Sequence, residues 1–339
     1  MKGYFKEMIL ILVLSLLIPL LTAGSIMRFN IGTVSQDEKE QTEDRKDGYT
    51  VPPKETDPPV SVITISVLLD GGTVTQMDLE EYVQGVVLKE MPADFEFEAL
   101  KAQAVVARTY AMRGKTVGSK HENADVCTNS ECCQAFCSRE EYLAAGGDAE
   151  MAEKVEKSVT ETKNAVLIYN GKLIEATYFS CSGGRTEDAL AVWGSDVPYL
   201  QSVESPGEEN AAHYSDTVTF SLDAFANCLN LSVPGSLEDW IGEVKYTQGG
   251  GVDTIQIGGA SFTGKELRKL LGLRSTNFSI NAAGDTVTVT TMGFGHRVGM
   301  SQYGADAMAA TGETYESILA HYYPGTTLTV WIDKENALG

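Results

Sequence analysis

Glu90 has the position in this sequence that points most directly to chemistry. It lies eleven residues after Leu79 and continues the apolar stripe of a predicted helix, so a carboxyl group occupies a face that helices normally bury. Burial and the negative end of the helix dipole both disfavour the ionised form, which predicts a raised pKa. A carboxylic acid that stays protonated near neutral pH can act as the general acid that cleaves a glycosidic bond. The alternative is a glutamate that points into solvent or pairs with Lys101 or Arg108.

Five potential metal ligands fall within one short segment that has little apolar content. They are His121, Cys127, Cys132, Cys133 and Cys137. Clustered soft ligands in a segment without a core favour zinc, because the metal would supply the ordering energy that apolar side chains do not. The spacing lacks the paired CxxC form, and in an exported protein some of these thiols could instead form disulfides.

Hydroxyl groups are concentrated at the end of a predicted strand. Tyr178, Ser180 and Ser182 alternate along the chain before a Gly183-Gly184 turn, so they would line one face of the strand. This arrangement suits sugar binding, although an exposed strand edge has the same pattern. Neither serine lies in a G-x-S-x-G elbow, which argues against a serine nucleophile.

His296 lies in a glycine-rich loop at 293–299, and Ser301 and Gln302 follow it. The loop lacks the Gly-Lys-Ser/Thr sequence of a phosphate-binding loop. His296 is therefore either a loop histidine with internal partners or a residue of the functional site. Arg108 either faces the site or lies on the surface, because helix spacing alone does not decide which way its side chain faces.

The elements that position these residues are predicted from cap and turn signals. Asp78 caps a helix that Pro92 ends, and Asn170-Gly171 predicts the tight turn of a hairpin between 165–169 and 173–180. The other expected elements are a hairpin that starts at 60, helices at 97–113, 151–160 and 263–271, and strands at 252–257 and 286–291. Together they indicate the α+β class, with mixed helices and antiparallel hairpins that form a groove.

The first 59 residues differ in character from the rest of the chain. Residues 8–27 are uncharged and, as a helix about 30 Å long, would span a bilayer, while Lys2 and Lys6 place residues 1–7 in the cytoplasm. A cleaved signal peptide is the alternative. Residues 28–59 are polar and proline-rich, which is typical of a tether. We therefore expect one transmembrane anchor and an extracytoplasmic domain at 60–335, with a Cys-rich insertion at 114–140.

The charge of the chain excludes one large class of function. Its 339 residues include 26 Lys and Arg against 47 Asp and Glu, a formal net charge of -21. Nucleic-acid binding needs clustered positive charge, so no nucleic-acid partner is expected.

Several separated motifs resemble the stage II sporulation protein D family. They occur in the family's order and extend over about residues 60 to 330. They are Gly85-Val86-Val87, Glu90-Met91-Pro92, Ala107-Arg108-Thr109-Tyr110, Tyr178-Phe179-Ser180, Ser182-Gly183-Gly184, Val192-Trp193, Gly295-His296, Ser301-Gln302-Tyr303 and His321-Tyr322-Tyr323. Two departures are Arg297, where the family usually has glycine, and Cys181, which replaces a small hydroxylated residue.

The resemblance implies a peptidoglycan lytic transglycosylase that acts in forespore engulfment during sporulation. Such an enzyme cuts glycan strands between N-acetylmuramic acid and N-acetylglucosamine after their stem peptides have been removed, and it leaves 1,6-anhydro ends. Glu90 matches the family's catalytic glutamate, and Arg108 matches an arginine expected near the active site. The other residues expected to bind substrate are Tyr178, Ser180, Ser182, His296, Ser301 and Gln302.

The resemblance also implies a metal and partners. Clostridial members carry a zinc site of one His and two Cys, which here would be His121, Cys127 and Cys133, with Cys132 or Cys137 as a rival third ligand. The expected partners are stage II sporulation proteins P and M in the mother-cell membrane that faces the forespore. Two alternatives stay open: a muramidase-type hydrolase, which needs a second carboxylate about 5 to 9.5 Å away, and a non-catalytic enhancer of a cell-wall amidase.

Overall fold

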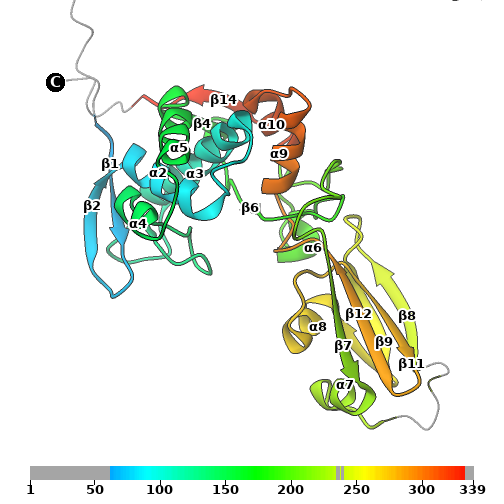
Figure 1. The fold of residues 1–339 in the computed structure, drawn as a ribbon. Helices are drawn as coiled ribbons and strands as arrows, with labels where there is room; N and C mark the ends of the chain where they lie inside the picture. Colours follow the sequence, from blue (N-terminus) through cyan, green and yellow to red (C-terminus); the bar gives the residue numbers. More distant parts are fainter. Residues whose placement is uncertain (1–61, 234–236, 238–239, 333–339) are drawn as a thin grey trace, which may run out of the picture. The chain divides into compact units, whose positions relative to one another are not determined.

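The computed structural model describes residues 62–233, 237 and 240–332. The expected cytoplasmic residues 1–7, the anchor at 8–27 and the tether at 28–59 lie outside the described residues. Within the described ranges, no helix combines the length and apolar character needed to cross a bilayer. Helices and mostly antiparallel strands are mixed along the chain, which confirms the α+β class (Figure 1).

The first hairpin leads directly into the helix that carries Glu90. These elements are β1 (Thr64–Leu68), β2 (Val74–Asp78) and α2 (Leu79–Glu90). The side chain of Asp78 caps the helix by accepting hydrogen bonds from the backbone N–H groups of Glu80 and Glu81. Because Pro92 disfavours helical backbone in the residue before it, Glu90 is the last helical residue. The predicted hairpin and capped helix are both confirmed.

One long helix, α3 (Phe97–Val117), lies at the centre of the larger core. It contacts α2, α5, α9 and α10 as well as strands β1 and β4. Its alanines at 99, 102, 104, 107 and 111 are buried, and such small side chains let neighbouring elements approach closely. The other helices of this core are α4 (Arg139–Ala144), α5 (Ala149–Glu161), α9 (Gln302–Ala310) and α10 (Tyr315–Tyr322).

Short strands complete the larger core in three small sheets, ordered β2-β1-β3, β14-β4-β5 and β13-β6. Their remaining members are β3 (Val126–Cys127), β4 (Ala165–Tyr169), β5 (Lys172–Leu173), β6 (Tyr178–Phe179), β13 (Met300–Ser301) and β14 (Thr327–Val330). Asn170 and Gly171 both have positive φ, as the predicted turn requires. The predicted strand at 173–180 is wrong as a single element. The chain leaves β4 after β5, and β6 pairs in parallel with β13 instead.

A second, smaller core is built from residues 215–292. Its elements are β7 (Ser215–Ser221), α7 (Leu222–Cys228), β8 (Ile241–Tyr246), β9 (Val252–Ile257), β10 (Ala260–Thr263), α8 (Gly264–Leu271), β11 (Phe278–Ala283) and β12 (Thr286–Met292). They form two antiparallel sheets, β10-β9-β8 and β11-β12-β7 (Figure 1). Thr263 and Glu266 make a reciprocal capping box at the start of α8. The predicted helix at 263–271 and the strands at 252–257 and 286–291 are confirmed.

Candidate active site

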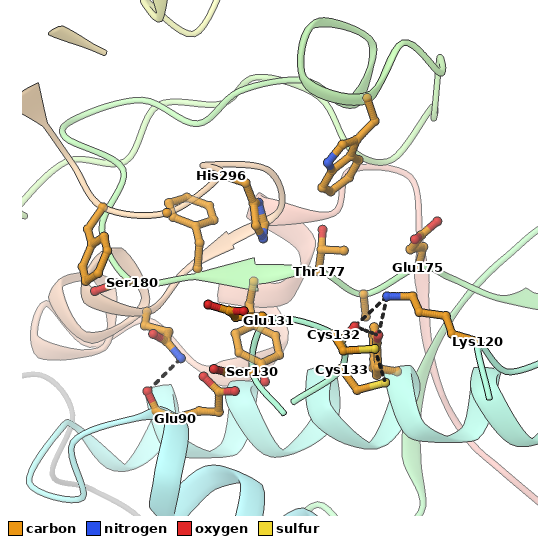
Figure 2. Close-up of a pocket in the computed structure, with 18 residues that line it drawn as sticks. Glu90, Lys120, Ser130, Glu131, Cys132, Cys133, Glu175, Thr177, Ser180 and His296 are labelled. Carbon is orange, nitrogen blue, oxygen red and sulfur yellow. Dashed lines mark hydrogen bonds between the residues drawn. The ribbon is translucent and has the colours of Figure 1, made fainter. Parts of the chain in front are cut away.

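A cavity of about 750 Å³ brings together residues from distant parts of the chain. Glu90 reaches it from the end of α2, while Tyr178 and Ser180 come from β6 and the residue after it. His296 and Gln302 complete the set from the glycine-rich loop and the start of α9 (Figure 2). Five of the eight residues predicted to catalyse the reaction or bind substrate therefore line one cavity.

The carboxyl group of Glu90 is held at the cavity wall by defined partners. Its Oε1 accepts a hydrogen bond from the backbone N–H of Ala135 at 2.5 Å. Burial raises its pKa above the usual value, and the hydrogen bonds from Ala135 and from the Tyr178 hydroxyl act in the opposite direction. The side chain of Gln302 donates to the backbone carbonyl of Glu90 at 3.1 Å, which links α9 to the end of α2 (Figure 2). The raised pKa agrees with the expectation from helix position.

A packed layer behind Glu90 fixes the segment that supplies Ala135. The Tyr82 hydroxyl donates to Oε1 of Gln134 at 3.3 Å, and Nε2 of Gln134 donates to the Tyr178 hydroxyl at 3.2 Å. The rings of Tyr82 and Phe136 stack with centroids 5.7 Å apart. Gly85 allows this packing, because a Cβ at that position would lie 2.2 Å from the Phe136 ring.

His296 is a neutral, aromatic part of the cavity. Its Nδ1 accepts a hydrogen bond from the backbone N–H of Val298 at 3.1 Å, which leaves the proton of the neutral ring on Nε2. Burial lowers the pKa of His296 to about 4, so the ring stays uncharged at physiological pH. Trp193, the last residue of α6 (Ala189–Trp193), lies 5.4 Å from this ring and is 44% exposed. Its indole offers an open apolar face to a ligand.

A second hollow of about 440 Å³ adjoins the cavity at Glu90. Glu90, Ser180 and Gln302 line both spaces, and the second is also lined by His213 and Tyr303. Glu90 therefore lies where the two hollows meet, and a chain-like ligand can extend from it in two directions.

Arg108 does not line the cavity, which corrects the expectation that it contacts substrate. Its side chain is fully buried and pairs with Glu80, with Nε at 2.9 Å from Oε1 and Nη2 at 2.5 Å from Oε2. The remaining N–H groups donate to the carbonyls of Val159 and Ala165 at 3.3 and 3.2 Å. The guanidinium thus joins α2, α3, α5 and β4, and its hydrogen-bonding capacity is used inside the protein.

Ser182 and Ser301 are buried as well, so their expected contact with substrate is also corrected. Both hydroxyls donate to the carboxylate of Glu208, which is 1% exposed. The same carboxylate accepts hydrogen bonds from the backbone N–H groups of Ser182 and Gly183 at 3.0 Å and from the Ser205 hydroxyl at 2.8 Å. Glu208 therefore fixes the loop after β6 and the N-terminus of α9. Sequence reasoning missed it, because nothing about its neighbours marks a buried carboxylate.

Arg297, where the resemblance to the family leads us to expect glycine, has a φ of 65°. This left-handed backbone favours glycine, so the departure is strained in principle. Its buried side chain compensates by donating to Glu187 at 3.3 Å and to the carbonyls of Ser182, Arg185 and Gly249 at 2.7 Å. The substitution therefore keeps the shape of the loop that carries His296.

Four of the five predicted metal ligands converge beside the cavity. The ligand atoms of His121, Cys127, Cys132 and Cys133 all lie within 4.8 Å of one another. Nε2 of His121 is 3.4 Å from Sγ of Cys133 and 3.7 Å from Sγ of Cys132. Tetrahedral zinc with bonds of about 2.0 to 2.3 Å places its ligands roughly 3.3 to 3.8 Å apart. Both His–Cys distances lie in this range, and the Sγ atoms of Cys132 and Cys133, which are 4.0 Å apart, lie just outside it. Cys137 is not part of this cluster.

Comparison with known proteins shows the family to which the chain is similar. Residues 70–169 match the family described as stage II sporulation protein. Stage II sporulation protein D of Bacillus subtilis (strain 168) is 41% identical over 262 residues, which cover 76% of each chain. An uncharacterized protein of Brachyspira hyodysenteriae is 36% identical over 269 residues, 77% of this chain and 70% of its own. The amidase enhancer of B. subtilis is 32% identical over 305 residues, 73% of this chain and 40% of its own.

Proposed function

Because this chain belongs to the stage II sporulation protein D family, we propose that it is a lytic transglycosylase that cleaves peptide-stripped glycan strands of peptidoglycan during sporulation. The observation that carries the proposal is Glu90, a half-buried carboxyl group of raised pKa at the junction of two hollows. Such a group can hold a proton until a sugar oxygen takes it. The family supplies the substrate class and the site supplies the acid.

Glu90 acts twice in the proposed reaction. As the acid, it protonates the glycosidic oxygen between N-acetylmuramic acid and N-acetylglucosamine, and the C1–O bond breaks. As the carboxylate, it then takes the proton from the C6 hydroxyl of the same muramic acid, whose oxygen bonds to C1. The product is a 1,6-anhydro end, and no water is consumed. The N–H of Ala135 and the Tyr178 hydroxyl stabilise the carboxylate between these steps.

The walls of the cleft supply groups that suit a sugar chain. Trp193 presents an exposed aromatic face, and Ser180 and Gln302 lie beside Glu90 in both hollows. Neutral His296 adds an aromatic ring to the wall without adding charge. Stacking and hydrogen bonding, which suit neutral sugar rings, therefore provide most of the binding surface.

We further propose that zinc is held by His121, Cys127, Cys132 and Cys133. Four protein ligands complete a tetrahedron, so the metal would order the Cys-rich segment and leave no open position for substrate. The two-cysteine set expected from the family is thereby extended by Cys132. The resemblance implies a site with three protein ligands, whereas the site proposed here has four and no open coordination position.

The setting of the enzyme is proposed on the same family grounds. The chain would be held in the mother-cell membrane by residues 8–27, with its N-terminus in the cytoplasm and the described domain outside. Stage II sporulation protein P, as an amidase, would supply stripped strands, and stage II sporulation protein M would hold the assembly in the membrane. The described residues carry neither the anchor nor a partner.

Two specific observations keep alternatives in view. Glu131 and Glu175 line the same cavity as Glu90, and either is a candidate second carboxylate for a hydrolase. The amidase enhancer of B. subtilis is a relative, which keeps a non-catalytic role in view. If the protein is a hydrolase, either Glu131 or Glu175 is as essential for cleavage as Glu90. If it is an amidase enhancer, none of the three glutamates is essential for its function.

The test is cleavage of purified stripped glycan strands by the full chain. We expect Glu90→Gln to abolish cleavage and to keep the wild-type unfolding temperature. Glu81→Gln, an exposed change on the same helix, is the matched control and should cleave normally. Loss of cleavage in Glu131→Gln or Glu175→Gln would favour a hydrolase. A folded wild-type chain that cuts nothing would contradict the proposal.

A further inference from the structure

Lys120 is the only lysine or arginine on the wall of the large cavity, whose lining residues all lie within the described ranges. His296 is the other basic lining residue, and its lowered pKa keeps it neutral. The carboxyl groups on the wall belong to Glu90, Glu131 and Glu175. A negatively charged substituent on a sugar therefore has one group on this wall that attracts it.

The ammonium group of Lys120 is positioned but not neutralised. Its Nζ donates to the backbone carbonyl of Cys132 at 2.7 Å and to the Tyr110 hydroxyl at 3.3 Å (Figure 2). Among the residues that the structure describes, Lys120 makes no ion pair. An ammonium group has three donors, so one N–H is available to a ligand.

A small side hollow of about 160 Å³ opens next to Lys120. Arg113 lines it and adds a second cation, while Asp125 and Glu175 also contribute to its wall. The Asp125 carboxylate already accepts hydrogen bonds from the backbone N–H and the hydroxyl of Ser66, at 2.8 and 3.2 Å. The volume of this hollow is sufficient for a small acid substituent of a sugar.

We propose that Lys120 recognises the free lactyl carboxylate of N-acetylmuramic acid and thereby selects glycan strands whose stem peptides have been removed. This inference rests on the function proposed above. On an intact strand the lactyl group ends in a neutral amide that continues into the peptide. Hydrolysis adds water across that C–N bond and leaves a carboxylate, which forms a charge-assisted hydrogen bond with an ammonium group. The reaction that must precede this enzyme is therefore amide hydrolysis at the lactyl group.

Glu90 and Lys120 line the same cavity (Figure 2). Glu90 lies on one side of the cavity, and Lys120 lies on the other, beyond Cys132 and Cys133. A strand that presents its glycosidic oxygen to Glu90 can therefore place a lactyl group near Lys120. Glu175 lines both the cavity and the side hollow, so its negative charge weakens the attraction that Lys120 offers.

The experiment compares two forms of one substrate with the full chain in mild detergent. The first form is peptide-free glycan with its lactyl carboxylates, and the second is the same glycan with those carboxylates converted to methylamides. We expect the wild-type KM to be about tenfold lower for the carboxylate form at low salt, with a similar kcat for both. The preference should shrink in concentrated salt, which screens the ion pair.

Three variants assign this preference to Lys120. Lys120→Met should raise KM about tenfold for the carboxylate form and leave the methylamide form unchanged. Lys120→Arg should restore most of the preference, because it keeps the charge. Lys115→Met is the matched control, since it removes an exposed cation in the last turn of α3 that does not line the cavity.

The outcomes separate this inference from the function on which it rests. If the wild-type chain cleaves both forms with equal KM, the selection by Lys120 is overturned and the proposed function stands. If it cleaves neither form, the proposed function itself fails. Equal losses on both forms in Lys120→Met, together with lost zinc or a lower unfolding temperature, would assign Lys120 a structural role and overturn the inference. If Lys120→Met does not fold, the KM values of the wild-type chain for the two strand forms still decide whether the carboxylate form is preferred, and Lys120→Arg still tests the role of Lys120.

Discussion

Replacement of Arg108 tests whether this residue supports the fold or contacts the substrate. The guanidinium is 0% exposed, and its partner Glu80 is 19% exposed, so Arg108→Met leaves a largely buried carboxylate without its cation. Breaking a buried ion pair in this way costs about 3 to 5 kcal/mol. For a domain of this size the unfolding temperature should fall by roughly 6 to 20 °C.

The assay combines urea unfolding of the variant with cleavage of stripped glycan at a temperature below its transition. We expect lower stability and, in the molecules that remain folded, cleavage close to the wild-type rate. Arg108→Lys should recover only part of the loss, because one ammonium cannot make the two parallel bonds to Glu80. Removing both partners in Glu80→Met with Arg108→Met should be less harmful than the sum of the single changes, by about 1 to 3 kcal/mol.

The opposite result would refute this reasoning. If Arg108→Met keeps wild-type stability but loses cleavage, the arginine acts on the substrate and the buried pair with Glu80 does not describe the working enzyme. Lys101→Met is a useful comparison, because Lys101 lies seven residues earlier on α3 and its ion pairs are partly exposed. Partly exposed pairs contribute only about 0 to 1 kcal/mol, so that variant should lose much less stability.

Three further predictions concern the metal, the acid and the aromatic wall. Purified chain should contain one zinc ion by metal analysis. Cys132→Ser should bind zinc more weakly than the wild type, and Cys137→Ser should bind it equally well. Equal binding by both variants would exclude Cys132 as a ligand. The cleavage rate should fall as pH rises through the raised pKa of Glu90. Tyr178→Phe should move this fall to higher pH, because the substitution removes a hydrogen bond that lowers the pKa of Glu90. A shift to lower pH in the pH–rate profile would contradict the assignment of Glu90 as the acid. Trp193→Ala should raise KM by about fivefold, which corresponds to about 1 kcal/mol, and an unchanged KM would show that sugars do not stack there.

Local signals predicted the parts of the fold that neighbouring residues determine. Asp78 and Pro92 mark the ends of α2, Thr263 marks the start of α8, and Asn170 with Gly171 marks a turn. The parallel pairing of β6 with β13 joins residues more than a hundred positions apart. No turn or cap signal encodes such a partner, so the strand expected at 173–180 was too long.

Local patterns likewise predicted some residues of the site but not those whose partners are distant in the sequence. Glu90 was predicted because its carboxyl group interrupts an apolar helix face, and the ligand cluster was predicted because its cysteines are close in sequence. The family resemblance, and not helix spacing, predicted a substrate contact for Arg108, and no local pattern shows that this side chain is buried in the core against Glu80. Ser182 and Ser301 were placed at the cavity for a related reason, because their common partner Glu208 has no local signature.

The central claim is that Glu90 cleaves glycan without using water, and the masses of the strand ends test it most directly. Stripped strands are digested in isotopically labelled water by the full chain and, in parallel, by Glu90→Gln. We predict ends that are one water lighter than hydrolysis gives, free of label, and absent from the Glu90→Gln digest. Labelled reducing ends would contradict the account and would make Glu131 and Glu175 the candidates for a second catalytic carboxylate.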